Sequence, residues 1–523
     1  MRPPSILLSV LALATAFAAS PANAASFAFV VLGEASDGRP LPMARAVVED
    51  ARACPVLRRA SGAIEAMQPR PSPGPTFASV LVCEAVYPWD EAASVVGPGL
   101  RHDLPKVSSA PPGRILVVGD SGCAGDTEPR TQPCGGLGYG PAWPFGRIAD
   151  DGRQDRPDLI VHVGDYNYRG TPRSIVLPPA ATGFVGPLKV EVFDTGDLDD
   201  ADETPSIPIG PGYFSQNVPG SPRPDNWADW RDDFFVPAAR LLTAAPWVFA
   251  RGNHELCSRG GPGWFYLLDT ASPLLGAGRR PDACPAQLPP GWRPGAWPPF
   301  ARPFEGLPFP TEPTRPWRLR LGSLNVIVLD SSDAGDWEIY SPQHYEAIFR
   351  HVAALLAEDA TPTWLVTHRP IWGVVRKGKG IADPGTPYGF INVTQQQAVA
   401  KAFPDGFPDH VAAIFSGHMH RFQAIGFDGR RPSQLVIGNG GMELSQTFPV
   451  PSRDRPKQPI PVPGLDGLTG WIVGLSDFGA LDVTLQPDGA WIGRLVSPSG
   501  ATLATCDSRW PKAGSSRPPC ALE

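Results

Sequence analysis

The sequence predicts an α/β protein built around strands that are buried on both faces. Continuous apolar runs occur at residues 114–118 and 159–163, and such runs are typical of parallel strands that are covered on both sides. Helical stretches at 342–358 and 394–403 lie between some of the later runs. The runs end in Asp, Asn or His, and ligand sites in α/β sheets lie at the carboxyl ends of strands. These observations predict a sheet with a polar site along one edge.

The first 24 residues have the features of an export signal. Arg2 supplies the positive charge, residues 6–19 form a short apolar core, and Ala22-Asn23-Ala24 is a cleavage site. The alternative is an N-terminal membrane anchor, but this run is too short to span a bilayer comfortably. No later segment has a clean run of about 20 apolar residues. We therefore predict a signal peptide at 1–24 and a periplasmic or secreted protein with no membrane span after cleavage.

The cysteines agree with export. Their even number suggests disulfides in an oxidising compartment, and sequential pairing is the simplest arrangement, although the sequence alone does not establish it. None forms a C-x-x-C pair, which argues against a zinc–thiolate site. The eight cysteines are Cys54, Cys83, Cys123, Cys134, Cys257, Cys284, Cys506 and Cys520.

The chain of 523 residues is long enough for two or three domains. Short strands at 27–32, 46–49 and 79–86 predict a small β domain over residues 25–110, with no catalytic cluster and with a structural role favoured. A Pro-rich connector then leads into the α/β pattern, which we assign to a catalytic domain at 111–500. Residues 501–523 form a tail that Cys506 and Cys520 are expected to staple.

The net charge and two minor motifs give no indication of a further partner or modification. A net charge of −7 gives no reason to expect nucleic acid or an anionic membrane surface as a partner. The acidic run at 194–203 fits either a calcium site or a solvated loop, and the loop is favoured. Asn392-Val393-Thr394 is a glycosylation sequence, but we expect no modification there.

The polar strand ends together indicate a metal centre. Carboxylate, amide and imidazole ligands without Cys suit iron, zinc or manganese. Six ligands are too many for one ion with an open position, so they suit two ions with Asp165 as the bridge. Two ions about 3.5–4 Å apart can clamp both oxygens of an in-line phosphoryl displacement. The six residues are Asp120, Asp165, Asn253, His368, His418 and His420.

The short sequence blocks that contain these six residues resemble the motifs of the calcineurin-like metallophosphoesterases. The resemblance covers roughly residues 112–445, and all five motif blocks occur in the family order. It implies a four-layer α/β/β/α sandwich and hydrolysis of phosphate esters. The blocks are Gly119-Asp120, Gly164-Asp165, Gly252-Asn253-His254-Glu255, Val366-Thr367-His368 and Gly417-His418-Met419-His420.

Two positions favour the purple acid phosphatase branch of this family. Most family members carry a His two positions after the first Asp, where this chain has Gly122. Tyr168 lies three residues after Asp165, where the branch places a tyrosinate on iron(III). Tyr166 is a competing candidate, and the spacing favours Tyr168. The N-terminal β unit also resembles the β domain of larger purple acid phosphatases.

The resemblance implies a role for each residue of the site. It assigns one ion, iron(III), to Asp120, Asp165, Tyr168 and His420. A divalent iron, zinc or manganese ion is then held by Asp165, Asn253, His368 and His418. His254 binds no metal and acts as a proton donor near the leaving group. Glu255 is a candidate to orient it, and Arg369 is either a phosphate contact or a surface residue.

The resulting expectation is an exported phosphatase that hydrolyses small phosphate monoesters by direct attack of a metal-bound hydroxide. The first alternative is an exported phosphodiesterase or nucleotidase on the same scaffold, because the five blocks are shared. The alternative from another class is a non-catalytic binding module, against which the intact ligand set argues. The sequence leaves the oligomeric state open.

Overall fold

A computed structural model gives the structure of the chain. It describes residues 26–125, 132–168, 174–177, 188–191, 225–256, 259–276, 284, 314–336, 342–376, 388–427, 431–445, 459–463, 469–509 and 518–523. The predicted signal peptide and the acidic run at 194–203 lie outside these residues.

The first of two large sheets carries the predicted site residues from the N-terminal part of the chain. Its central strands β9, β10 and β13 are parallel, so their carboxyl ends meet at one edge of the sheet. The described strands follow in the spatial order β27 (Cys520–Leu522), β26 (Thr502–Asp507), β25 (Trp491–Val496), β24 (Ala480–Leu485), β9 (Arg114–Val118), β10 (Leu159–His162), β13 (Trp247–Phe249), β1 (Ser26–Glu34), β2 (Pro40–Glu49), β6 (Val80–Val86) and β5 (Gln68–Pro69).

The second large sheet carries the predicted site residues from the C-terminal part of the chain. Strands β15, β16, β19 and β21 are parallel, and antiparallel strands flank them on both sides. Its order is β14 (Trp317–Arg320), β15 (Asn325–Val328), β16 (Thr363–Val366), β19 (Val411–Ser416), β21 (Ser433–Ile437), β20 (Phe422–Phe427), β23 (Thr469–Leu475) and β22 (Ile460–Pro463).

The two sheets pack face to face through alternate residues of their strands. Successive side chains of a strand point to opposite faces. Val117 and Val161 of the first sheet therefore share a core with Val366 and Phe415 of the second. The neighbouring Leu116 faces the other way, into a separate core on the outer face of the first sheet. Each central strand is thus buried on both sides, which explains its continuous apolar sequence.

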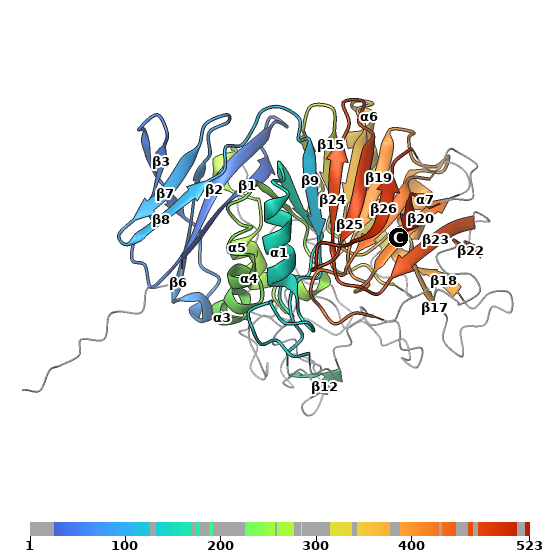
Figure 1. Cartoon of the computed structure of the whole chain (residues 1–523), viewed down its shortest axis with the longest axis horizontal. Coiled ribbons are helices and arrows are strands. Elements are labelled where there is room, and N and C mark those ends of the chain that lie inside the picture. The colour runs from blue at the N-terminus through green and yellow to red at the C-terminus, as the bar shows by residue number, and fades with distance from the viewer. Residues whose placement is uncertain are drawn as a thin grey trace, which may run out of the picture.

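Helices cover the two outer faces and complete the predicted four-layer α/β/β/α sandwich (Figure 1). Ile148 of α1 and Phe265 of α5 pack in the outer core of the first sheet. Ile348 of α6 and Val399 of α7 pack in the outer core of the second. The helices are α1 (Phe145–Gln154), α3 (Trp227–Trp230), α4 (Val236–Ala238), α5 (Gly261–Leu267), α6 (Pro342–Ala357) and α7 (Val393–Ala402).

The N-terminal region is rich in strands, as predicted, but the large sheet runs through it without a break. Strand β1 pairs in parallel with β13, with Val31 opposite Trp247. Strands β3 (Val56–Arg59), β4 (Ile64–Ala66), β7 (Ala93–Gly97) and β8 (Leu100–Leu104) form a separate small sheet, at the left of Figure 1. Strands β26 and β27 likewise join the sheet beyond residue 500. The domain boundaries at 110 and 500 therefore do not coincide with breaks in the sheet, and the division stays a prediction.

Three of the expected disulfides are present: Cys54–Cys83, Cys123–Cys134 and Cys506–Cys520. Cys284 is also disulfide-bonded, and its predicted partner Cys257 lies outside the described residues. Among the residues that the structure describes, no helix is long and apolar enough to cross a membrane.

Candidate metal centre

The polar residues at the strand ends come together where the two sheets meet. Asp120, Asp165 and Asn253 follow β9, β10 and β13 of the first sheet. His368 follows β16 of the second sheet, and His418 follows β19. All of the predicted site residues are buried, at no more than 3% exposed each: Asp120, Asp165, Tyr168, Asn253, His254, His368, His418 and His420.

One group of side chains surrounds the phenol oxygen of Tyr168, and we call Asp120, Tyr168 and His420 the first half of the centre. The Tyr168 oxygen lies 3.1 Å from Oδ1 of Asp120 and 3.1 Å from Nε2 of His420. It also lies 3.0 Å from Oδ2 of Asp165. A carboxylate pair, a phenol and an imidazole thus point at one small volume.

A second group surrounds the amide oxygen of Asn253, and we call Asn253, His368 and His418 the second half. The Asn253 Oδ1 atom lies 2.8 Å from Nε2 of His368 and 2.8 Å from Nδ1 of His418. His368 Nε2 is also 3.1 Å from Oδ2 of Asp165. Asp165 therefore contacts both halves.

This donor set fits metal ions. Ligand atoms of Asp120, Asp165 and His368 lie within 4.8 Å of one another, and all three residues are buried. Oxygen and imidazole donors of this kind suit iron, zinc or manganese. Buried carboxylates that face one another also need a compensating positive charge.

The pKa values of the clustered residues also favour the binding of a cation. Burial and the neighbouring Asp165 charge raise the pKa of Asp120 to about 8. Burial opposes ionisation of Asp165 too, but the His368 imidazole lowers the pKa of Asp165 below its ordinary value. Burial alone would lower the pKa of His368, yet the Asp165 carboxylate raises it to about 9. The cluster on its own therefore retains protons that a cation would displace.

Backbone conformation aims these side chains. Asp120, Asp165, His418 and His420 all have positive φ angles, of 53°, 58°, 77° and 43°. Residues other than glycine rarely adopt this left-handed conformation, and such strain gathers at functional sites. The backbone N–H of His418 donates to Oδ1 of Asp120 at 2.9 Å, so the two sheets are tied together at the strained positions.

Gly122 is required by the ring of Tyr168. A Cβ atom at position 122 would lie 2.8 Å from Cδ2 of Tyr168 and 2.6 Å from the carbonyl oxygen of Tyr166. The tyrosine ring thus fills the space that a larger residue at 122 would need. Tyr166 points elsewhere, because its hydroxyl donates to the carbonyl oxygen of Ala250 and its ring stacks on His162. Of the two tyrosines, Tyr168 is the one at the centre.

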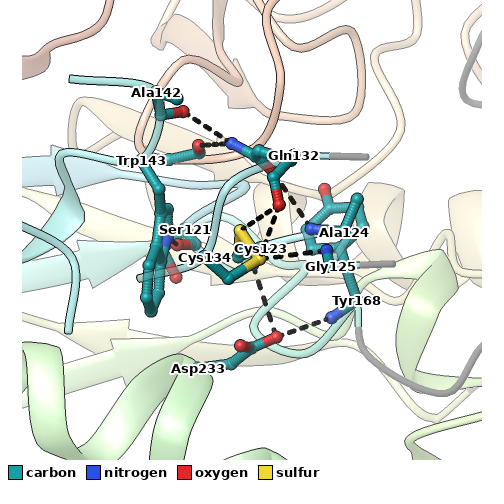
Figure 2. Close-up of a disulfide and its surroundings, with 11 residues drawn as sticks. Ser121, Cys123, Ala124, Gly125, Gln132, Cys134, Ala142, Trp143, Tyr168 and Asp233 are labelled. Carbon is teal, nitrogen blue, oxygen red and sulfur yellow. Dashed lines mark hydrogen bonds between the residues drawn. A yellow bond between two sulfur atoms is a disulfide. The ribbon is translucent and has the colours of Figure 1, made fainter. Parts of the chain in front are cut away.

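A disulfide holds the loop that follows Asp120 (Figure 2). The backbone N–H of Cys123 and that of Tyr168 both donate to Oδ2 of Asp233, at 3.3 and 3.2 Å. Gln132 accepts from the backbone N–H of Ala124 and donates to two carbonyl oxygens. The Cys123–Cys134 bond therefore closes this loop, and Asp233 ties the loop to the backbone of Tyr168.

His254 and Glu255 lie against the Asp165 loop. The backbone N–H of His254 donates to Oδ1 of Asp165 at 2.9 Å, and its ring lies 4.0 Å from the Tyr168 ring. The Glu255 carboxylate accepts from the backbone N–H groups of Asp165 and Tyr166, at 3.0 and 2.9 Å. Glu255 thus fixes the backbone of Asp165, which contacts both halves of the centre.

Sequence reasoning missed Asp336, and it placed Arg369 at the surface or on phosphate. Arg369 is only 5% exposed, and its guanidinium bonds Oδ2 of Asp336 at 2.6 Å. Asp336 in turn lies 2.8 Å from Nε2 of His418. The sequence feature that could have indicated Asp336 is the apolar run at 325–329, which is followed by a polar segment, as the other strands of the site are.

Asn392 of the glycosylation sequence is completely buried. It caps α7, and its side-chain amide donates to Oδ1 of Asp336 at 2.9 Å. Its side chain is therefore inaccessible to a glycosyltransferase in the folded protein.

Comparisons with known proteins agree with this geometry. The fold is similar to that of a purple acid phosphatase from yellow lupin (Lupinus luteus) seeds, with a TM-score of 0.52 and 12% identity. The similarity covers 92% of this chain and 73% of the lupin chain. No curated protein matches the sequence. The family model for calcineurin-like phosphoesterases matches residues 113–422, more than half of the chain, and the protein therefore belongs to the calcineurin-like phosphoesterase family.

Proposed function

We propose that this phosphoesterase is an exported phosphatase that hydrolyses small phosphate monoesters at a centre of two metal ions. The observation that carries the proposal is the convergence of Asp120, Asp165 and His420 on the Tyr168 oxygen, within 3.1 Å. The second half supplies a matching set on the other side of Asp165. Two such ions would activate water as the nucleophile and neutralise the phosphoryl oxygens.

The first half is assigned to iron(III), and the second half to a divalent iron, zinc or manganese ion. A phenolate ligand favours a strongly acidic cation, and Tyr168 provides that ligand in the first half. The second half has an amide and two imidazoles, which are neutral ligands and suit a divalent ion. A single oxygen of Asp165, Oδ2, lies near both sets, at 3.0 Å from the Tyr168 oxygen and 3.1 Å from Nε2 of His368.

His254 is assigned to proton transfer. It lies beside the first half, with its backbone bonded to Asp165 and its ring against Tyr168. From this position it would stabilise charge on the phosphoryl oxygens and donate a proton to the leaving oxygen. The chain therefore keeps metal ligation and acid–base chemistry on separate residues.

Export is supported by the sequence of the first 24 residues and by the disulfides. Three disulfides are described, and such bonds persist in oxidising compartments. Fractionation of the native host, with the mature N-terminus sequenced, tests this part. Cleavage after Ala24 is the expected result, and an uncleaved protein in the cytoplasm would contradict it.

The Tyr168→Phe variant tests the iron–tyrosinate assignment. We expect the purified protein to contain two metal ions and to show a visible charge-transfer band that the variant lacks. Tyr166→Phe is the matched control, because its hydroxyl bonds the backbone at Ala250, and it should retain the band. An iron-containing wild-type protein without such a band would refute the tyrosinate.

The His254→Ala variant tests the catalytic assignment. We expect kcat for p-nitrophenyl phosphate to fall by roughly 10²–10⁴-fold, the usual contribution of a general acid, while both metal ions are retained. Full activity in this variant would remove His254 from the mechanism. The same assay with bis(p-nitrophenyl) phosphate decides between monoesters and diesters, and faster turnover of the diester would favour a phosphodiesterase.

A further inference from the structure

Asp336 contacts the metal-ligand cluster from outside it. The residue lies in the loop after β15 and is 2% exposed. Its Oδ2 atom is 2.8 Å from Nε2 of His418, while Nδ1 of the same imidazole is 2.8 Å from Oδ1 of Asn253. The imidazole of His418 is therefore held between the Asp336 carboxylate on one side and the second half of the centre on the other.

We propose that Asp336 is a positioning residue for His418, which fixes the ring and the tautomer in which Nδ1 can bind the ion of the second half. This inference rests on the proposed two-metal function and deepens it.

The contacts of Nε2 favour this tautomer once an ion is bound. A neutral imidazole that gives its Nδ1 lone pair to an ion carries its proton on Nε2. An ionised carboxylate can only accept hydrogen bonds, so Oδ2 of Asp336, at 2.8 Å, is the acceptor for that proton. Nη1 of Arg369 also lies 3.0 Å from Nε2 but can only donate, so of these two groups only Asp336 can accept the proton.

Two further residues hold the carboxylate itself. Arg369, the neighbour of His368 in the chain, donates from Nη1 to Oδ2 of Asp336 at 2.6 Å. Asn392 donates from its side chain to Oδ1 at 2.9 Å, and its backbone N–H donates to the Asp336 carbonyl at 2.9 Å. Both carboxylate oxygens are thus bonded, and the ring of His418 meets a fixed partner.

The arrangement has a direct consequence for metal affinity. A carboxylate that accepts from a ligating imidazole orients the ring and makes it a stronger ligand, and loss of such a partner typically lowers affinity by about 10–100-fold. We expect this loss only at the second half, because Asp336 is bonded to His418 and the first half is built from Asp120, Tyr168 and His420.

The test compares Asp336→Ala and Asp336→Asn with the wild-type protein, each purified with the first half filled. Zn²⁺ is titrated from metal buffers, and the bound ion is counted per chain. We expect a 10–100-fold weaker Zn²⁺ affinity in Asp336→Ala. A smaller loss is expected in Asp336→Asn, whose amide oxygen can still accept from His418. The visible band of the first half should be unchanged in both variants. Phosphatase activity should recover as free Zn²⁺ is raised by the factor that the affinity has lost.

Glu84→Gln is the matched control for loss of a buried charge. Glu84 lies on β6, away from the strand ends that carry the predicted ligands, and is 3% exposed. Its carboxylate forms ion pairs with Arg45 and Arg70. Its Zn²⁺ affinity should equal that of the wild-type protein. Equal affinity in Asp336→Ala and the wild-type protein would overturn the inference, as would an equal loss in Glu84→Gln. If Asp336→Ala fails to fold, Asp336→Asn decides by the same titration.

Failure of the proposed function gives a different result. In that case the wild-type protein itself would bind fewer than two ions and lack phosphatase activity. A wild-type protein with two ions and unaltered Asp336 variants would instead leave the function standing and refute only the role of Asp336.

Discussion

The two halves of the metal centre are supported by different kinds of interaction. Around the first half, a disulfide staples the loop after Asp120, and Asp233 ties Cys123 to the backbone of Tyr168. Around the second half, His418 is held by a buried polar network of Asp336, Arg369 and Asn392. The first half thus has a covalent restraint of its loop in addition to hydrogen bonds, whereas charge and hydrogen bonding support the second half.

This difference follows from where the ligands come from in the chain. The first half includes Tyr168, which lies beyond the end of its strand and close to the long segment after it. The sheet alone therefore does not place Tyr168, and contacts with the loop after Asp120 help to hold it. The second half takes both imidazoles from residues close behind β16 and β19, which the sheet already places. What remains there is ring orientation, and hydrogen bonds to the ring supply it.

Asp165→Asn should give the largest effect, because this residue touches both halves. The amide keeps the size of the side chain and can still accept from the backbone of His254, but it lacks the bridging charge. We expect fewer than one ion per chain and a fall in kcat/KM of roughly three powers of ten or more, since metal ions contribute several kcal/mol to phosphoryl transfer. Metal analysis and the phosphatase assay measure both.

Asp158→Asn is the control for this substitution. Asp158 is exposed and accepts from the backbone N–H groups of Gly113 and Arg114, at the opposite end of the strands. This variant should keep both ions and full activity. Two ions bound normally by Asp165→Asn would show that the halves share no ligand at position 165.

Replacing the Cys123–Cys134 pair by alanines should weaken metal binding in the first half and leave the second half unaffected. Loss of this short cross-link should cost roughly 3 kcal/mol in the free energy of unfolding. We expect weaker binding in the first half, seen as a reduced tyrosinate band, with the ion of the second half retained. Denaturant unfolding and metal analysis give the two readouts.

The Cys506–Cys520 pair supplies a close match for this experiment. It spans 14 residues against 11 for Cys123–Cys134, and it lies at the edge of the first sheet. Its removal should cost a similar amount of stability and leave the band intact. Loss of the band in both double variants would mean that general stability, and not the loop, controls the first half.

Much of this centre could be predicted from the sequence, because parallel strands end at a common edge. Asp120, Asp165 and Asn253 each follow an apolar run, and that placement alone brings them together. Local pattern and strand order are sufficient for these three residues. The prediction of Tyr168 over Tyr166 rests on the resemblance to the purple acid phosphatase branch, and the structure agrees with it because Gly122 leaves space for the Tyr168 ring.

The rest depends on pairings between distant segments. Strand β1 meets β13 across more than 200 residues of chain, so the sequence did not show that the N-terminal strands extend the large sheet. Asp336 reaches His418 across 82 residues, from a strand whose polar end resembles an ordinary loop. Such contacts depend on tertiary packing, and no periodicity or spacing in one sequence records them.

The smallest effect that we predict is a count of protons, two from the first half and one from the second. In the metal-free protein the pKa of Asp120 is raised to about 8 and that of His368 to about 9. Both groups therefore hold a proton at pH 7, and both must lose it to bind an ion. The proposed tyrosinate requires Tyr168 to lose its phenol proton as well. We expect roughly three protons to be released per chain when both ions bind at pH 7.

The sign of the pH dependence follows from the same protons. The apparent metal affinity of the second half should rise with pH while His368 is protonated and level off once the pH exceeds about 9. Calorimetry in two buffers of different ionisation enthalpy measures the release. In Cys123→Ala/Cys134→Ala, which should fill only the second half, the count should drop to about one. Release of only about one proton by the wild-type protein, the one from Tyr168, would show that Asp120 and His368 are already deprotonated before an ion binds.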